Sequence, residues 1–170
     1  MKWVRRFLLI AVLAVAAWFG YGYFFPDEEA RIRKHLDGLT EAATVTADFN
    51  TLGKLASATR LAGHFASEVV IRLEGVGEGA ESIHGRDEVQ QIAVAAMAQI
   101  QSLEPGFHDV SITIAPDQES ANVHLTALAR VDGEPDLFAQ ELKMKLRKFD
   151  GDWLITEVET VRTLGNGPIR

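Results

Sequence analysis

The sequence contains no cysteine, and this absence excludes several kinds of chemistry. A chain without thiols forms no disulfide, binds no metal through thiolates, has no cysteine nucleophile and offers no N-terminal cysteine for lipid attachment. Metal-binding histidine patterns are also missing, because no HxH, HxxxH or HxxE spacing occurs among the five histidines. A metal site needs several ligands at workable spacing, so the sequence predicts no metal.

Positive charge is scarce beyond the first few residues. Three of the 17 basic residues, Lys2, Arg5 and Arg6, lie at the N-terminus, while the chain holds 24 acidic residues and a net charge of −7. An acidic domain repels phosphate backbones, so nucleic acid is not an expected partner. The glycine-rich run at residues 75–79 is surrounded by acids and is not followed directly by a predicted helix, so it predicts no phosphate cradle. We therefore expect no cofactor.

The longest apolar run covers residues 7–25, FLLIAVLAVAAWFGYGYFF, and contains no charge. At about 1.5 Å per residue, a helix of this length just crosses a hydrocarbon core of about 30 Å. Trp18, Tyr21 and Tyr23 at its far end are side chains typical of a membrane interface, and Pro26 ends the run. This run predicts a signal anchor with a single transmembrane helix.

Two other interpretations of the apolar run stay open. A cleaved signal peptide would use Lys2–Arg6 as its positive region, Phe7–Val15 as its apolar core and Ala14–Ala16 as its cleavage site. Cleavage there would leave a strongly apolar mature end, which is a poor start for a soluble protein. A buried core helix is disfavoured, because basic residues stand on one side of the run and aromatic residues on the other.

The flanking charges predict where the domain lies. Cations before the span favour a cytoplasmic N-terminus, although Arg31, Arg33 and Lys34 follow the span closely. With either an anchor or a cleaved signal, the domain is outside the cytoplasm. We therefore expect a single-pass protein of the bacterial inner membrane, with its domain in the periplasm or at the cell surface.

Three helices are predicted after the apolar run. A proline followed by three acids at Pro26–Glu29 is a helix-start signal, and Asn50 or Thr51 can cap a second helix. A third helix begins at Gly85–Glu88, and Pro105–Gly106 ends it. The positions expected to face the core are Ile32, Leu36, Leu39 and Ala43 in the first helix, Leu52, Leu55, Thr59, Ala62 and Phe65 in the second, and Val89, Ile92, Ala93, Ala96, Ile100 and Leu103 in the third.

Alternation with a period of two predicts the strands. One strand covers Ser67–Leu73, three more alternate between residues 110 and 146, and the last begins near Trp153. Turn signals at Asp132–Gly133 and Asp150–Gly151 separate the later strands. The faces expected to point inward are Val110, Ile112 and Ile114; Val123, Leu125, Ala127 and Ala129; and Leu142, Met144 and Leu146.

Three segments carry a resemblance to a known family: HFASEVVIRLEG at residues 64–75, IHGRDEVQQIA at 83–93 and LRKFDGDWLITEVE at 146–159. They resemble, in order, the passage from the second helix to the first strand, the G-R-[DE] start of the third helix, and the final hairpin of the nuclear transport factor 2-like superfamily, which includes the SnoaL-like domains.

The resemblance implies an α+β cystatin-like cone, in which a curved antiparallel sheet packs on three helices. It covers residues 26–164, between the anchor at residues 1–25 and a tail at residues 165–170. Members of this superfamily include isomerases, cyclases, dehydratases, binding modules and catalytically silent assembly domains. The fold therefore implies a cone that can hold a small ligand, without naming a reaction.

The inward strand faces predict a pocket lined by carbon. An isomerase or cyclase of this shape needs an acid or base in an apolar environment. The strand residues with ionisable side chains, such as Lys143 and Arg147, fall on the opposite face. We therefore expect a small apolar ligand to contact Val110, Ile112, Leu125, Ala127, Ala129 and Met144.

His64 and His84 are the candidate catalytic residues. His64 lies near the end of the second predicted helix, and His84 just before the third. In the cone that the resemblance implies, both can reach the mouth and transfer a proton. The interpretation of each as a partly exposed structural histidine stays open.

The sequence favours a membrane-anchored domain that binds a ligand or scaffolds an assembly without catalysis. Its charged outer sheet face would then contact a second copy or an envelope protein. One span followed by this fold is also the layout of the periplasmic assembly subunits of type IV secretion systems. The alternatives are a SnoaL-like isomerase or cyclase that acts on a small apolar molecule by proton transfer, and a spacer without a ligand.

Overall fold

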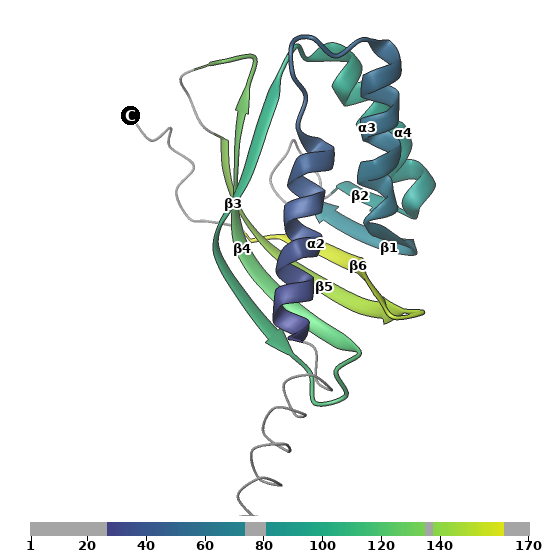
Figure 1. Cartoon of the computed structure of the whole chain (residues 1–170), viewed down its shortest axis with the longest axis vertical. Helices are drawn as coiled ribbons and strands as arrows, with labels where there is room; N and C mark the ends of the chain where they lie inside the picture. Colours follow the sequence, from purple (N-terminus) through teal and green to yellow (C-terminus); the bar gives the residue numbers. More distant parts are fainter. Residues whose placement is uncertain (1–26, 74–80, 135–137, 162–170) are drawn as a thin grey trace, which may run out of the picture.

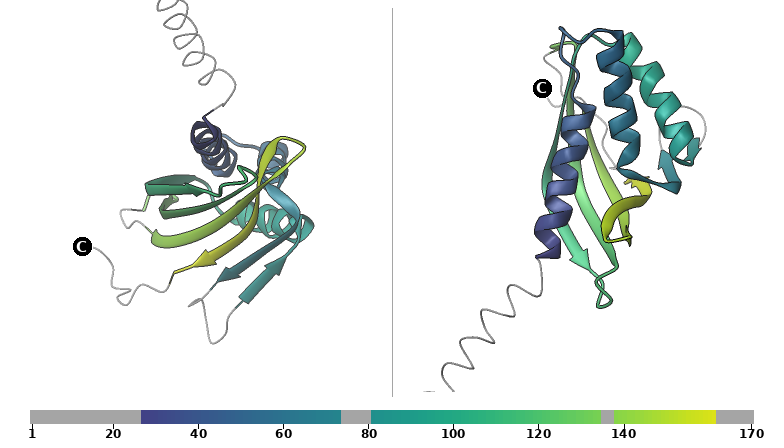
Figure 2. Two further views of the ribbon diagram at one scale, coloured as in Figure 1. Left: turned by 90° about the horizontal axis from the view of Figure 1, so that it is seen from below. Right: turned by 45° about the vertical axis from the view of Figure 1, so that its right-hand side comes forward.

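The computed structural model describes residues 27–73, 81–134 and 138–161, and it confirms the predicted α+β architecture (Figure 1). A curved sheet has helices on one side, and two of the helices lie next to each other (Figure 2). Within the described residues the helices are α2 (Glu28–Ala43), α3 (Thr51–Gly63) and α4 (Arg86–Gln99), and the strands are β1 (Phe65–Leu73), β2 (Glu81–His84), β3 (Leu103–Ile114), β4 (Ser120–Val131), β5 (Phe138–Phe149) and β6 (Asp152–Thr160).

The sheet is mixed, whereas the sequence predicted an antiparallel one. The strand order is β2-β1-β6-β5-β4-β3, and β1 runs parallel to β6 while the other neighbours are antiparallel. No hairpin joins β1 to β6, so their direction is set by the path of the whole domain. Strand β2 was not predicted, because alternation is hard to recognise in four residues.

The predicted helix starts are confirmed in the local geometry. The side chains of Asp27 and Asn50 each accept a hydrogen bond from the amide three residues later, at 3.3 and 2.8 Å. Gly85 precedes α4 with a φ of 84°, and a Cβ there would lie 3.3 Å from the carbonyl oxygen of Ser67. Both the left-handed backbone and this close approach favour glycine at position 85.

The predicted inward face of the second helix is wrong for Leu52, Leu55 and Thr59, whereas Ala62 and Phe65 are buried as predicted. Leu52 and Leu55 are 75% and 46% exposed, and Thr59 is exposed as well. In α4, Ile92 and Ala96 are also exposed. The two helices pack on each other mainly through small side chains such as Ala58 and Ala93. This contact determines how each helix is rotated about its axis, so the larger leucine and isoleucine side chains point to solvent. The buried residues are Ser57, Ala58 and Ala62 in α3 and Val89, Ala93 and Met97 in α4.

The third predicted helix is too long at its C-terminal end. Helix α4 ends at Gln99, and Leu103 already belongs to β3. Leu103 exchanges two backbone hydrogen bonds with Val45, at 2.8 and 3.0 Å, and these long-range contacts favour the extended backbone. Pro105 therefore lies inside a strand, where it is tolerated because β3 is at the edge of the sheet.

The inward strand faces form the core, as predicted. They pack against Ile32, Leu36 and Leu39 of α2. The register of β3 against β4 shifts between His108 and Ser111, where Asp109 has a φ of 52°. Such a bulge shifts the alternation by one residue, so Phe107 and Val110, three positions apart, both pack against the core. Of the ten strand residues predicted to point inward, nine belong to the core or pack against it. They are Val110, Ile112, Ile114, Val123, Leu125, Ala127, Leu142, Met144 and Leu146.

The ionisable strand residues expected on the outer face, such as Lys143 and Arg147, are exposed, as predicted. Glu157 of β6 forms ion pairs with Arg72 of β1 and Lys145 of β5. Exposed pairs of this kind contribute at most about 1 kcal/mol to stability. Whether this face binds a second copy or an envelope protein stays a prediction.

Several sequence predictions lie outside the described residues. They concern the apolar run at residues 7–25, the glycine-rich run at 75–79 and the tail at 165–170. Among the described helices, none combines the length and the apolar character that crossing a membrane requires. The anchor therefore stays a prediction.

Glu28 in the first turn of α2 is buried, with 8% exposure. Besides its favourable place at the positive end of the helix, it binds residues of the sheet. The indole Nε1 of Trp153 donates to Glu28 Oε2 at 2.8 Å, and Lys148 Nζ lies 2.9 Å from Oε1. Burial raises the pKa of Glu28, but the hydrogen bonds from Lys148 and Trp153 outweigh it, so the pKa is lowered and the carboxylate stays charged. This cluster joins the start of α2 to the β5–β6 hairpin.

Replacing Glu28 by alanine is expected to lower the free energy of unfolding by about 2–4 kcal/mol, because the Lys148 ammonium and the Trp153 indole lose their shared acceptor. Glu29 is the matched control, since it lies in the same helical turn but is 48% exposed, and its one ion pair among the described residues is with the exposed Arg33. Glu29→Ala should cost about 0.5 kcal/mol or less. Urea unfolding of both variants measures the difference, and equal costs would contradict a structural role for Glu28.

Candidate functional site

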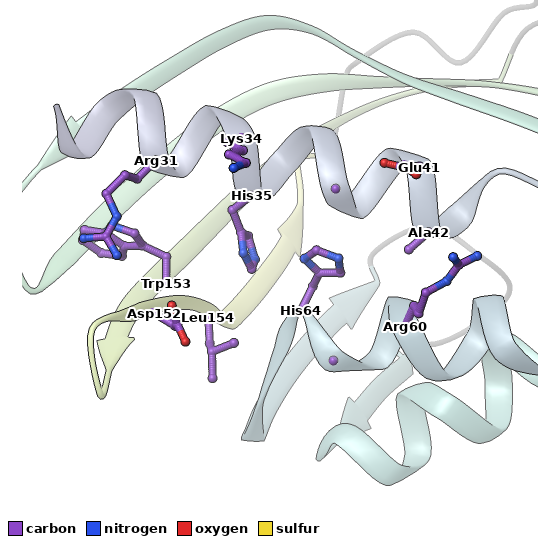
Figure 3. A pocket seen from close by; sticks show the side chains of 12 residues that line it. Arg31, Lys34, His35, Glu41, Ala42, Arg60, His64, Asp152, Trp153 and Leu154 are labelled. Atoms are coloured by element: carbon purple, nitrogen blue, oxygen red, sulfur yellow. The ribbon is translucent and has the colours of Figure 1, made fainter. Parts of the chain in front are cut away.

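A cavity of about 740 Å³ opens between α2, the C-terminal end of α3 and the start of β6 (Figure 3). This volume is in the range of small-molecule sites. Two histidines and five charged residues contribute to its walls, next to several apolar side chains. The residues that line this histidine pocket are Arg31, Lys34, His35, Gly38, Glu41, Ala42, Arg60, Gly63, His64, Asp152, Trp153 and Leu154.

His35 and His64 meet at the centre of the pocket. Their ring centroids are 4.6 Å apart, and the ring planes are inclined at 71°. His64 is held by its backbone: its amide donates to Leu61 O at 3.1 Å, and its carbonyl accepts from the Ile155 amide at 3.0 Å. The end of α3 and strand β6 therefore position the His64 ring against α2.

Gly38 allows the His64 ring to approach α2. A Cβ at position 38 would lie 3.0 Å from His64 Cε1, closer than side chains normally pack. Any larger residue would push the ring away from the helix, so glycine at this position preserves the contact between the two histidines. Its place three residues after His35 in α2 puts both residues on the same side of the helix.

Burial lowers the pKa of both imidazoles. It lowers the pKa of His35 to about 4, with help from the nearby His64 and against the attraction of Asp152. Burial also lowers the pKa of His64, although a hydrogen bond with the Gly38 backbone opposes this effect. Both rings are therefore neutral at neutral pH. Within the described residues, the buried Nε2 of His35 has no hydrogen-bond partner.

The charges around the pocket differ from those of the whole chain. Arg31, Lys34 and Arg60 outnumber Glu41 and Asp152, whereas the chain as a whole carries a net charge of −7. The rim therefore lacks the negative excess of the whole chain. Its cations Lys34 and Arg60 can attract anions to the pocket.

The structure separates the two candidate catalytic histidines. His64 lines the pocket, whereas His84 is exposed at the end of β2 and is not part of the lining. His35 is the partner that the sequence analysis did not select. Its signal was its position three residues after Ile32 and four before Leu39, which places it close to the buried stripe of α2.

The six residues predicted to contact a ligand lie elsewhere. Leu125 and Met144 are buried in the core, and Val110, Ile112 and Ala127 pack against it. Ala129 is partly buried and pairs with Phe138 in the sheet. None of the six lines the histidine pocket. A ligand role for them stays a prediction.

Metal ligands are not grouped in the part of the chain that the structure describes. No three residues among its histidines and acids are close enough to hold an ion. The pocket itself offers two neutral imidazoles that can donate and accept hydrogen bonds, cations that can hold an anion, and an apolar wall at Trp153 and Leu154.

Comparisons with known proteins place the fold. No protein-family model and no curated protein matches the chain. Among solved structures, an NTF2-like protein of unknown function from Pseudomonas putida superposes with a TM-score of 0.63, at 11% identity over 81% of this chain and 88% of that one. A scytalone dehydratase-like protein from Novosphingobium aromaticivorans has a TM-score of 0.60, at 15% identity over 84% and 89% of the two chains.

A third similar structure comes from Nostoc punctiforme and is a protein of unknown function with a cystatin-like fold. Its TM-score is 0.59, at 12% identity over 80% of this chain and 92% of that one. At these identities the likeness concerns the fold alone. The described domain therefore has the cystatin-like, NTF2-like fold that the sequence predicted.

The neutral state of His35 predicts a pH-dependent stability. Between pH 6.5 and about 4 the unfolded chain binds a proton at this position and the folded chain does not, so stability is full above pH 6.5 and falls as the pH falls. The loss by pH 4 is expected to reach roughly 3 kcal/mol. Urea unfolding at several pH values measures it.

His35→Gln should flatten this part of the pH profile, because glutamine does not titrate. His84→Gln, at an exposed position, is the matched control and should keep the wild-type profile. A His35→Gln protein that loses as much stability as the wild type between pH 6.5 and 4 would rule out this role of His35.

Proposed function

We propose that the domain is a small-molecule binding module, and that the ligand occupies the histidine pocket. The observation that carries this proposal is the contact between two partly buried imidazoles, His35 and His64, in an open cavity of about 740 Å³. The fold supports a ligand-binding or isomerase-type domain, since the similar structures include a scytalone dehydratase-like protein.

The state of His35 supports a ligand site. A buried polar atom without a partner, such as its Nε2, costs about 1–3 kcal/mol, and proteins retain such a cost mainly where it has a use. A neutral imidazole offers one donor and one acceptor, so it can hydrogen-bond a polar ligand without desolvating a charge. The two rings are therefore suited to hold a polar group.

The pKa of His35 favours binding over catalysis. A general base works best when its pKa lies near the working pH, and the pKa of His35 is about 4. Such a weak base removes few protons from a substrate at neutral pH. We therefore place binding first and proton transfer second.

Binding in this pocket predicts a local response. Titration of the full-length protein with benzyl alcohol, benzamide and benzoate, as small probes with one aromatic ring, should shift the imidazole NMR signals of His35 and His64 for at least one probe. The signal of His124, on the outer sheet face, should not move.

His64→Ala should weaken this binding by about tenfold, which corresponds to one lost hydrogen bond of roughly 1.4 kcal/mol. His124→Ala is the matched control and should bind like the wild type. If no probe moves the signals of His35 and His64, or if His64→Ala binds normally, the pocket is not the binding site.

Proton transfer by His64 is the second candidate function. Its ring lines the pocket and is neutral at neutral pH, so it can accept a proton from a substrate. An isomerase-type base should accelerate exchange of the α-protons of a small ketone, such as cyclohexanone, in deuterated water. Exchange that is faster with the wild type than with His64→Ala would favour this function, and equal rates would leave binding alone.

We also propose that residues 7–25 anchor the protein in a bacterial inner membrane, with the domain on the outer side. The uncharged length of this run and the aromatic residues at its end support the proposal. Because the chain has no cysteine, single cysteines can report the topology. In intact spheroplasts, a membrane-impermeant maleimide should label Ser111→Cys, at an exposed position, but not Lys2→Cys. The reverse pattern, or labelling of both, would contradict this orientation.

A further inference from the structure

We infer that the ligand of the histidine pocket is a small carboxylic acid with an apolar body, and that the positive charges of Lys34 and Arg60 on the rim attract its carboxylate. This inference rests on the proposed binding function and adds the chemical class of the ligand. The geometry that carries it is the position of two cations, each without an acidic partner among the described residues, on the rim of a cavity that also contains His64. Both lie around the pocket in Figure 3.

Six of the twelve lysines and arginines in the described residues form no ion pair, and Lys34 and Arg60 are the two of these six that line the histidine pocket. In the described ranges, neither Lys34 nor Arg60 forms an ion pair, although the chain holds more acids than bases. An unpaired cation on an acidic protein is available for an anion from solution. The cations that do pair with a carboxylate are Arg31, Arg33, Arg72, Arg130, Lys145 and Lys148.

A hydrogen bond within α3 positions the side chain of Arg60. Its Nη2 donates to Ser57 Oγ at 3.0 Å, and Ser57 is fully buried in α3. A buried hydroxyl anchors one end of the guanidinium and leaves its other N–H groups for the pocket. Arginine prefers planar acceptors such as carboxylates, because its donors form a rigid fork.

The remaining groups around the pocket limit the ligand to one anionic group. On α2, Arg31 is already paired with Glu28, while Glu41 adds a negative charge to the rim. On β6, Asp152 adds another negative charge near His35. These two acids disfavour ligands with several negative charges.

The walls of the pocket suit an apolar body. Gly38 and Ala42 of α2 leave room, and Leu154 of β6 offers carbon surface next to the buried Trp153. A cavity of about 740 Å³ is large enough for an aromatic or branched acid. The ligand class is therefore a monocarboxylic acid with a ring or a branched chain.

An anion at this place should make His64 easier to protonate. The charged residues that line the pocket with His64 are Arg31, Lys34 and Glu41 on α2, Arg60 on α3, and Asp152 on β6, besides the neighbouring His35. A bound carboxylate favours the charged imidazole next to it. Its affinity should therefore rise as the pH falls from 7.5 to 5.5, while the affinity of a neutral ligand should change little.

The test compares benzoate with benzamide on the full-length protein, by NMR of the histidine rings in 50 mM salt. We expect benzoate to bind at least about tenfold more tightly, because the amide lacks the charge for the cations. Lys34→Ala and Arg60→Ala should each weaken benzoate by about fivefold and leave benzamide unchanged. Lys143→Ala, at an exposed outer-face position, is the matched control and should change neither. Raising the salt to 500 mM should weaken benzoate alone.

The outcomes separate this inference from the proposed function. If benzamide shifts the signals of His35 and His64 as readily as benzoate, or if both cation variants bind benzoate normally, the pocket binds ligands but does not select an acid. If no probe shifts these signals, the proposed function itself is wrong for this pocket. A preference for benzoate that Lys143→Ala abolishes would move the anion site to the outer sheet face and also overturn the inference.

Discussion

The carboxylate of Glu28 is the contact on which the pocket depends. It accepts the indole hydrogen of Trp153 and pairs with Lys148, so the first turn of α2 is fixed to the β5–β6 hairpin. Trp153 thereby takes two roles, since it also forms part of the pocket wall. Because His35 and Gly38 lie on the same helix, the position of α2 sets the distance between the two histidines. A structural ion pair and a candidate binding site thus share one helix and one tryptophan.

The position of the cavity follows from how the interior of the cone is filled. Leucine, isoleucine, valine and methionine side chains of the sheet pack on α2 and form the core. A well-packed interior has little room for a ligand near these side chains. The described cavity lies instead along the open side of α2, where Gly38, Ala42 and Gly63 are small. Burying His35 there lowers its pKa to about 4, and this shift keeps the ring neutral and ready for hydrogen bonding.

The fold and the site carry different information about function. Similar structures include a scytalone dehydratase-like protein and two proteins of unknown function, at 11–15% identity. One fold that hosts several activities does not select among them. The choice between binding and proton transfer rests on the histidine pair, and above all on the pKa of about 4 that burial gives His35.

Local signals in the sequence determined the helix starts at Asp27 and Asn50, the strand faces and the hairpin before Trp153, because caps, period-two alternation and tight turns act over a few residues. Only the tertiary structure decided the parallel pairing of β1 with β6, the rotation of α3 that exposes Leu52, and the extended backbone at Pro105. His64 was visible as a candidate, but its partner His35 stands 29 positions earlier in the chain, and nothing local connects the two. Their contact depends on the packing of α2 and α3 against β6, which no short-range pattern encodes. The same packing brings Lys34 and Arg60 to the rim of one pocket.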